Sequence, residues 1–319
     1  MDILKEIINQ INSIKKSDST TYLDSVLTHL NRAEYYYKQG ISDSNYFNDV
    51  IYRGNQAYEG ALKESFKVLA DKTESEVFKK TPNDIEKFFE SNNIFRERVL
   101  QLFKNYRQEW RNKSTHDHKL FFDENEAFLA LTSVSSFVHL LLKQIQEKIA
   151  FNLQQKKLTE EKKQIEEINE LVQQSNDDPR KKLEDIITRF AKSNAPYIHN
   201  SKDIREVEII GLFDAYIRSA KGLSIQREPK FHVNGMDIRP DFLIEVDDTP
   251  IILEFKKQKL GNMQDSNAVN QVLVYMQATM SDYGIIYYSI FDSPTPEIKI
   301  DRLRHTVNDK SYDVSIIKS

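Results

Sequence analysis

Three charged residues in the C-terminal part of the chain have types and spacing suited to phosphodiester chemistry. Asp241 follows Pro240, while Glu254 and Lys256 are separated by a single residue. The intervening Asp-Asp-Thr-Pro at 247–250 is typical of a turn, so we expect Asp241 and Glu254 on neighbouring strands of a hairpin-like pair. Asp241 then reaches the strand end where Glu254 lies.

Strand alternation places Glu254 and Lys256 on one face, opposite Phe255. An acidic residue on a buried strand is costly unless something compensates its charge. Two carboxylates a few ångströms apart repel each other and call for a cation. Oxygen ligands without His or Cys favour Mg²⁺ or Mn²⁺. Lys256 is suited to orient or activate water and to stabilise developing phosphate charge.

This pattern resembles the PD-(D/E)xK nuclease superfamily, with Pro240-Asp241 followed by Glu254-Phe255-Lys256 and twelve residues between Asp241 and Glu254. The resemblance covers about residues 200–290. It implies a restriction-endonuclease-like domain that cleaves DNA with Mg²⁺ or Mn²⁺ held by Asp241, Glu254 and the carbonyl of Phe255. Lys256 is then the catalytic lysine.

The same family typically adds an acidic residue on a preceding helix, here predicted at 202–221. Glu206 shares a face with the apolar positions of that helix and is the first choice, with Glu208 on the adjoining face as the second. Some relatives carry Gln-x-x-x-Tyr on the following helix, and Gln271 and Tyr275 match it. These two residues and Lys257 are predicted to contact nucleic acid.

A second motif lies in the N-terminal half. Arg111 and His116 are separated by four residues, with Asn112 directly after the arginine. Arg plus His suffices for metal-independent RNA cleavage, because His transfers the proton and Arg stabilises the charge on phosphorus. A structural role is the alternative, with Arg111 at a helix C-terminus and His116 in a loop. A metal site at 116–118 lacks third and fourth ligands at sensible spacing.

The segment from Arg111 to His116 resembles the Arg-x4–6-His motif of the HEPN family, over about residues 20–145. The resemblance implies an all-helical fold and catalytic roles for Arg111 and His116. It also implies a homodimer, because the active groove of that family commonly forms between two protomers. Arg107, one helical turn before Arg111, is predicted to contact nucleic acid.

The periodicity predicts a multi-domain α + α/β chain. We expect a helical bundle at 1–150, a charged helical linker at 151–178 and an α/β nuclease-like domain with a mixed central sheet at 179–319. Helices are predicted at 45–70, from Pro82, at 96–113 and at 125–150. Strands are predicted at 225–233, 241–246, 251–255, 284–291 and 312–317, with a helix at 267–280.

Composition narrows the function classes. The chain has 319 residues, no cysteine and a net charge of −4, which excludes thiol chemistry and leaves nucleic-acid binding to local basic patches. No glycine pattern suits a phosphate-cradling loop, and the most apolar run, 133–142, is too short to cross a membrane. A cytoplasmic protein without a membrane segment is expected.

Three functions remain open on the sequence. The first is a DNA nuclease acting in prokaryotic anti-phage defence or as a toxin. The second is an RNase toxin of the HEPN type whose C-terminal domain binds nucleic acid. The third is a dimeric adaptor without catalysis, which the presence of Asp241, Glu254, Lys256, Arg111 and His116 argues against.

Overall fold

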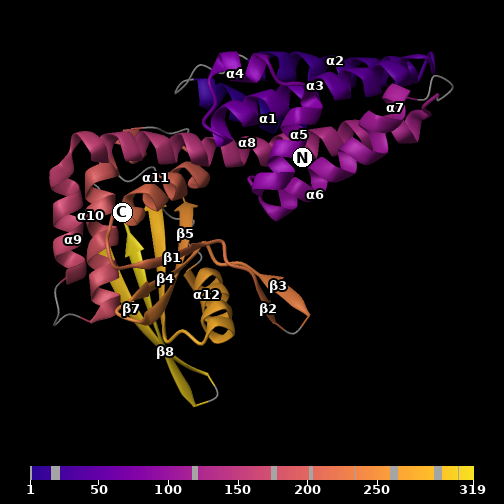
Figure 1. Cartoon of the computed structure of the whole chain (residues 1–319). Coiled ribbons are helices and arrows are strands. Elements are labelled where there is room, and N and C mark those ends of the chain that lie inside the picture. Colours follow the sequence, from indigo (N-terminus) through magenta and orange to yellow (C-terminus); the bar gives the residue numbers. More distant parts are fainter. Residues whose placement is uncertain are drawn as a thin grey trace. The chain divides into compact units, whose positions relative to one another are not determined.

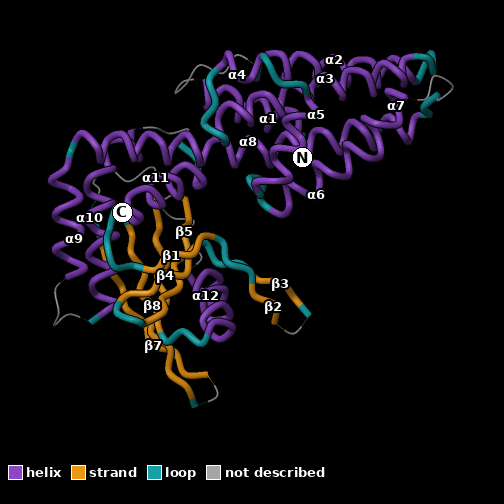
Figure 2. Tube along the Cα trace, in the orientation of Figure 1, coloured by secondary structure: helices purple, strands orange, loops and turns teal. Residues whose placement is uncertain are grey.

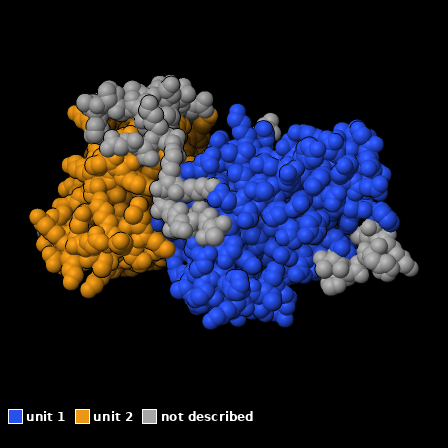
Figure 3. All heavy atoms as spheres, turned by 90° about the horizontal axis from the view of Figure 1, so that it is seen from above, with its two compact units in different colours: residues 1–149 blue, residues 150–319 orange. Residues whose placement is uncertain are grey.

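The computed structural model describes residues 2–15, 22–116, 121–173, 178–200, 204–233, 235–258, 265–290, 297–307 and 309–319. The chain divides into two compact units, Met1–Ile149 and Ala150–Ser319 (Figure 3). The first is helical and the second combines helices with a mixed six-stranded sheet (Figures 1 and 2). The predicted α + α/β layout is therefore present.

The first unit is a bundle of helices, and no strand occurs among its described residues. Thr81 caps a helix that begins at Pro82, as predicted, through a reciprocal bond with Asp84. The elements are α1 (Ile3–Lys15), α2 (Leu23–Gly40), α3 (Tyr46–Leu69), α4 (Glu74–Phe78), α5 (Pro82–Asn92), α6 (Glu97–Tyr106), the π-helix η1 (Arg107–Arg111), α7 (Asn112–His116) and α8 (Glu124–Glu160).

Helix α8 continues across the boundary between the units. By length and composition alone, this helix is long and apolar enough to cross a membrane. A core helix meets the same criterion, and 44% of the apolar stretch is buried. Phe137, Leu141 and Ile145 of α8 lie in the apolar core of the first unit, which accounts for its composition.

The predicted linker, 151–178, is instead part of the second unit. Leu158 at the end of α8, and Ile168 and Leu171 of α9 (Lys162–Gln173), are buried in that unit's larger core. Helix α10 (Pro179–Asn200) contributes Leu183 and Phe190 to the same core. The thin apolar seam of the charged segment is thus a packing face rather than a free coiled-coil edge.

The sheet runs in the order β1-β4-β5-β6-β8-β7. Strands β5, β6 and β8 are mutually parallel, while β1, β4 and β7 pair antiparallel. The strands are β1 (Ser224–Arg227), β4 (Phe242–Val246), β5 (Thr249–Gln258), β6 (Tyr283–Ile290), β7 (Lys299–Val307) and β8 (Lys310–Lys318); β2 (Phe231–Val233) and β3 (Met236–Ile238) form a separate ribbon.

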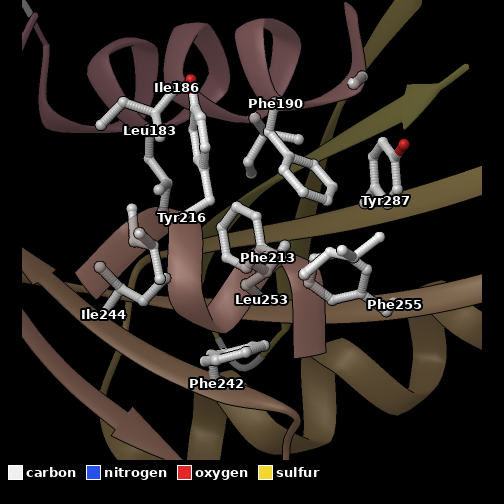
Figure 4. Packing of buried hydrophobic residues seen from close by; sticks show 14 of the residues in the cluster. Leu183, Ile186, Phe190, Phe213, Tyr216, Phe242, Ile244, Leu253, Phe255 and Tyr287 are labelled. Atoms are coloured by element: carbon white, nitrogen blue, oxygen red, sulfur yellow. The ribbon is translucent and has the colours of Figure 1, made fainter. Parts of the chain in front are cut away.

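Helices cover both faces of the sheet. On one face, α10 and α11 (Glu206–Arg218) bury an aromatic core, shown in Figure 4. On the other face, α12 (Asp265–Thr279) packs over alternate residues of the same strands. The residues labelled in Figure 4 are Leu183, Ile186, Phe190, Phe213, Tyr216, Phe242, Ile244, Leu253, Phe255 and Tyr287.

Two features of the sheet differ from expectation. The strand predicted at 225–233 is two strands in separate sheets, because Glu228 has a positive φ of 46° and Pro229 follows it. Strand β7 was not predicted, because it is an edge strand whose side chains are mostly exposed and charged, without apolar alternation.

Gly284 provides a stability test of the α12 face. A Cβ at this position would lie 2.5 Å from Val272 and 2.7 Å from the Met276 sulfur, both on α12. We expect Gly284→Ala to destabilise the second unit by about 1–3 kcal/mol. Adding Met276→Ala should cost less in the G284A background than in the wild-type chain. Urea unfolding followed by circular dichroism measures both changes, and additive losses would contradict this packing.

Candidate functional site

The β4–β5 hairpin fixes the position of the predicted carboxylates. Asp247 and Asp248 both have positive φ, 48° and 60°, which gives the tight turn expected of a two-residue hairpin. The register pairs Phe242 with Leu253, so one step further Asp241 lies opposite Glu254. The alternation also holds, because Ile252 packs beneath α12 whereas Leu253 packs beneath α11 and α10.

Hydrogen bonds join Asp241 to Glu254 and to the backbone of Phe255. The backbone N–H of Asp241 donates to Oε2 of Glu254 at 3.2 Å, and the N–H of Phe255 donates to Oδ2 of Asp241 at 2.8 Å. The N–H and C=O of one strand residue face the same side. The carbonyl of Phe255 therefore also faces the side on which Asp241 lies.

Burial shapes the electrostatics of this pair. Glu254 is 4% exposed, and burial raises the pKa of its carboxyl. Burial, followed by the neighbouring Glu254 carboxylate, raises the pKa of Asp241 to about 7. Two acidic groups that resist ionising together form a site that a cation stabilises.

Lys256 and α12 complete the surroundings of Glu254. The Lys256 Nζ lies 2.7 Å from Oε1 of Glu254; burial opposes its charge, but the surrounding carboxylates outweigh this and raise its pKa. Gln271 donates to the same Oε1 at 3.2 Å and to the Tyr275 hydroxyl at 2.7 Å. The structure therefore brings the Gln-x-x-x-Tyr pair to the carboxylates, with Gln271 in contact and Tyr275 behind it.

The two acidic candidates on α11 have different partners. Oε2 of Glu206 accepts a hydrogen bond from the backbone N–H of Lys257 at 2.7 Å, at the end of β5. Oε2 of Glu208 accepts from the N–H of Arg205 at 2.8 Å and so caps its own helix. Glu206 is also close enough to raise the pKa of Glu254. Of the two, Glu206 is the one at the site.

Arg227 joins the site although no sequence motif indicates it. From the end of β1 its Nη1 donates to the carbonyl of Asp241 at 2.7 Å and lies 3.7 Å from Oδ1 of the same residue. Its guanidinium also sits over the Phe242 ring, 4.9 Å from the centroid. This contact depends on the antiparallel pairing of β1 with β4, which no local pattern reveals.

Two basic residues predicted to contact nucleic acid are engaged within the fold. The Lys257 ammonium donates to the carbonyl of Ile204. Arg107 pairs with Glu90 at 2.9 Å, and its side chain is 18% exposed. These contacts favour structural roles for both side chains.

The Arg111 motif follows a π-turn. The described residues include a single π-helix, η1, a feature often found near functional sites. Arg111 donates to Oδ1 of Asn112 at 3.0 Å, and its charge acts on buried Glu86, whose pKa burial raises. The backbone of His116 ends α7, but its side chain, Asp117 and His118 lie outside the described residues.

Within the described ranges, no group of three His, Cys, Asp or Glu side chains is placed to hold a metal ion. A cation at this site would therefore rest on Asp241, Glu254, the Phe255 carbonyl and water, a ligand set that Mg²⁺ accepts. Comparisons with protein-family models, curated proteins and solved structures give no match.

The carboxylate pair predicts an unusual pH dependence of stability in metal-free buffer. The folded-state pKa of Asp241, about 7, lies above its ordinary value of 3.8. Between these values the folded chain keeps a proton that the unfolded chain releases, so stability falls as pH rises and levels off above pH 7. We expect a loss on the order of 1–3 kcal/mol across this window.

Asp241→Asn is the matched control for this pH effect, because asparagine does not titrate. Urea unfolding at several pH values, with EDTA present, should show a steeper fall for the wild-type chain than for D241N. Parallel curves of stability against pH for the two proteins would show that Asp241 keeps its ordinary pKa in the folded chain and would contradict this prediction.

Proposed function

We propose that the second unit is a divalent-metal-dependent nuclease, with Asp241, Glu254 and Lys256 as its catalytic residues and a restriction-endonuclease-like fold. The observation that carries the proposal is the contact between two carboxylates, Asp241 directly before β4 and Glu254 on β5; Glu254 is buried and the Asp241 side chain is 19% exposed. Lys256 lies 2.7 Å from one of them and two residues further along the same strand. Two carboxylates and a lysine in contact suit the binding of a metal ion and a phosphate better than they suit packing of the protein core.

The donor set fits Mg²⁺ or Mn²⁺. Asp241, Glu254 and the carbonyl of Phe255 would hold the ion. The raised pKa of Asp241 reflects the free energy needed to ionise it beside Glu254, and a bound cation would lower that free energy. When bound, the ion supplies positive charge against the negative charge that develops on the phosphate. The protein itself positions the substrate, and the Lys256 ammonium supplies a second positive charge.

The surrounding residues have separable roles. Lys256 orients the attacking water and stabilises charge on the phosphate, held by its ion pair with Glu254. Gln271 fixes the Glu254 carboxylate, and Glu206 fixes the end of β5 through Lys257. Arg227 anchors the backbone of Asp241 and balances its charge.

Double-stranded DNA is the proposed substrate, and defence against phage or a toxin role in a prokaryotic cytoplasm is the proposed setting. The first unit is proposed to be HEPN-like and to form a homodimer. The substrate and setting follow from the resemblance at Asp241, Glu254 and Lys256, and the HEPN-like fold and homodimer follow from the resemblance at Arg111 and His116.

A second candidate function belongs to the first unit. A π-turn ends at Arg111, and the Arg111 charge acts on the buried Glu86 carboxylate. These two features favour a functional site at Arg111 over the role of an ordinary surface arginine. Metal-independent RNA cleavage by Arg111 and His116 is the corresponding activity. RNA cleavage that resists EDTA and disappears in Arg111→Ala would support it.

The nuclease proposal is tested by a cleavage panel. Duplex DNA, single-stranded DNA and RNA are incubated with Mg²⁺, Mn²⁺ or EDTA. We expect metal-dependent DNA cleavage that falls at least about 100-fold in each of Asp241→Asn, Glu254→Gln and Lys256→Met. The first two variants remove a carboxylate that would hold the metal ion, and the third removes a positive charge that stabilises the transition state. Undiminished DNA cleavage in D241N, or wild-type DNA cleavage that persists in EDTA, would refute this site.

Glu206 and Glu208 form a matched pair of variants on one helical turn. Glu206→Gln should lower cleavage roughly tenfold, because it weakens the support of β5 beside the carboxylates. Glu208→Gln should leave the cleavage rate near wild type and cost about 0.5–2 kcal/mol of stability, because it weakens a helix cap. Equal loss of activity in the two variants would remove Glu206 from the site.

A further inference from the structure

The β2–β3 ribbon is not needed to build the sheet or the carboxylate site. It pairs only with itself and projects beside α12 (Figure 1). Phe231 and Ile238, which face each other across the ribbon, pack against the core beneath α12 and fix its base. Only Arg239 and Pro240 separate the ribbon from Asp241, a span of roughly 10 Å at most.

The two faces of the ribbon differ in chemistry. Phe231 and Ile238 turn toward α12, so strand alternation turns His232 and Asp237 the other way. On this outer face the Asp237 carboxylate lies 2.8 Å from the Lys230 ammonium and 2.9 Å from Nδ1 of His232. Asp237 therefore holds two donors in place, and the His232 side chain remains 68% exposed.

We propose that the β2–β3 ribbon enters the major groove of double-stranded DNA and presents Lys230 and His232 to it. This rests on the proposed nuclease function, because the ribbon matters only if a duplex lies over Asp241. The major groove of B-form DNA admits a two-stranded β-ribbon, and its base edges offer acceptors to Lys and His donors. The deep, narrow major groove of A-form RNA does not admit such a ribbon.

The outer face favours nucleic acid over a protein partner. Protein interfaces rely on aromatic or apolar anchors at their centre. The face formed by Lys230, His232 and Asp237 presents charged and hydrogen-bonding groups, and the exposed apolar side chain of the ribbon, Met236, lies on the opposite face by strand alternation. Because the ribbon directly precedes Asp241 in the chain, a duplex bound at the carboxylate site would also lie against this face of the ribbon.

Direct binding tests the ribbon separately from catalysis. The full-length chain is titrated, in EDTA, with a short duplex DNA, a duplex RNA of the same sequence and the single DNA strand. We expect Lys230→Ala/His232→Ala to bind duplex DNA about tenfold or more weakly than the wild-type chain. Lys310→Ala is the matched control, because Lys310 also pairs with one aspartate, at 2.8 Å, and is similarly exposed. It should bind as the wild-type chain does.

A second duplex locates the groove. Bulky glucosyl groups on the cytosine C5 positions fill the major groove and leave the minor groove open. They should weaken binding of the wild-type chain several-fold and change that of K230A/H232A little. Equal weakening of both proteins, or wild-type affinity in K230A/H232A, would overturn the proposal. Duplex RNA bound as tightly as duplex DNA would do the same.

Hydrolysis of a small phosphodiester, bis(p-nitrophenyl) phosphate, separates the two proposals. This ester is too small to contact the ribbon while it is bound at the carboxylate site, so K230A/H232A should hydrolyse it at the wild-type rate. If the wild-type chain cleaves neither this ester nor DNA with any metal, the nuclease proposal fails. The binding titrations still decide the ribbon, and a wild-type chain that does not bind duplex DNA ends that proposal too.

Discussion

The close contact of two carboxylates, buried Glu254 and partly buried Asp241, is the constraint on which the arrangement of the second unit depends. Asp241 and Glu254 repel each other in a place with little water, and the fold surrounds them with compensating donors. These are the backbone N–H groups of Asp241 and Phe255, the Lys256 ammonium, the Gln271 amide and the Arg227 guanidinium. A core of apolar residues would have filled the same space at lower cost.

The layered fold explains how those donors arrive. Helices on opposite faces of the sheet both send a side chain to the same end of β5. From α11, Glu206 reaches the backbone of Lys257, and from α12, Gln271 reaches Glu254. The aromatic core beneath α10 and α11, and the close approach of α12 to Gly284, hold these helices in register with the strand. Packing remote from the carboxylates therefore sets their geometry.

The first unit shows the same use of a buried acid in an all-helical setting. Glu86 is 2% exposed, accepts a hydrogen bond from Tyr58 and lies 3.8 Å from Arg107. Arg107 begins the π-turn that ends at Arg111, so the acid stabilises the segment that carries the N-terminal motif. The charge pair between Arg107 and Glu86 therefore adds to the backbone hydrogen bonds of the π-turn, such as the one from the Asn112 N–H to the Arg107 carbonyl.

The sequence by itself determined the helical and mixed halves, the β4–β5 hairpin and the grouping of Asp241, Glu254 and Lys256, because period and turn chemistry are local properties. It did not determine that 151–178 packs into the second unit, that β7 forms an edge strand, or that Arg227 meets Asp241. The sequence also did not decide between Glu206 and Glu208, since both lie on the same helical turn; their different hydrogen-bond partners in the fold distinguish them. These outcomes depend on which surfaces meet across long separations in the chain, and only tertiary packing decides that.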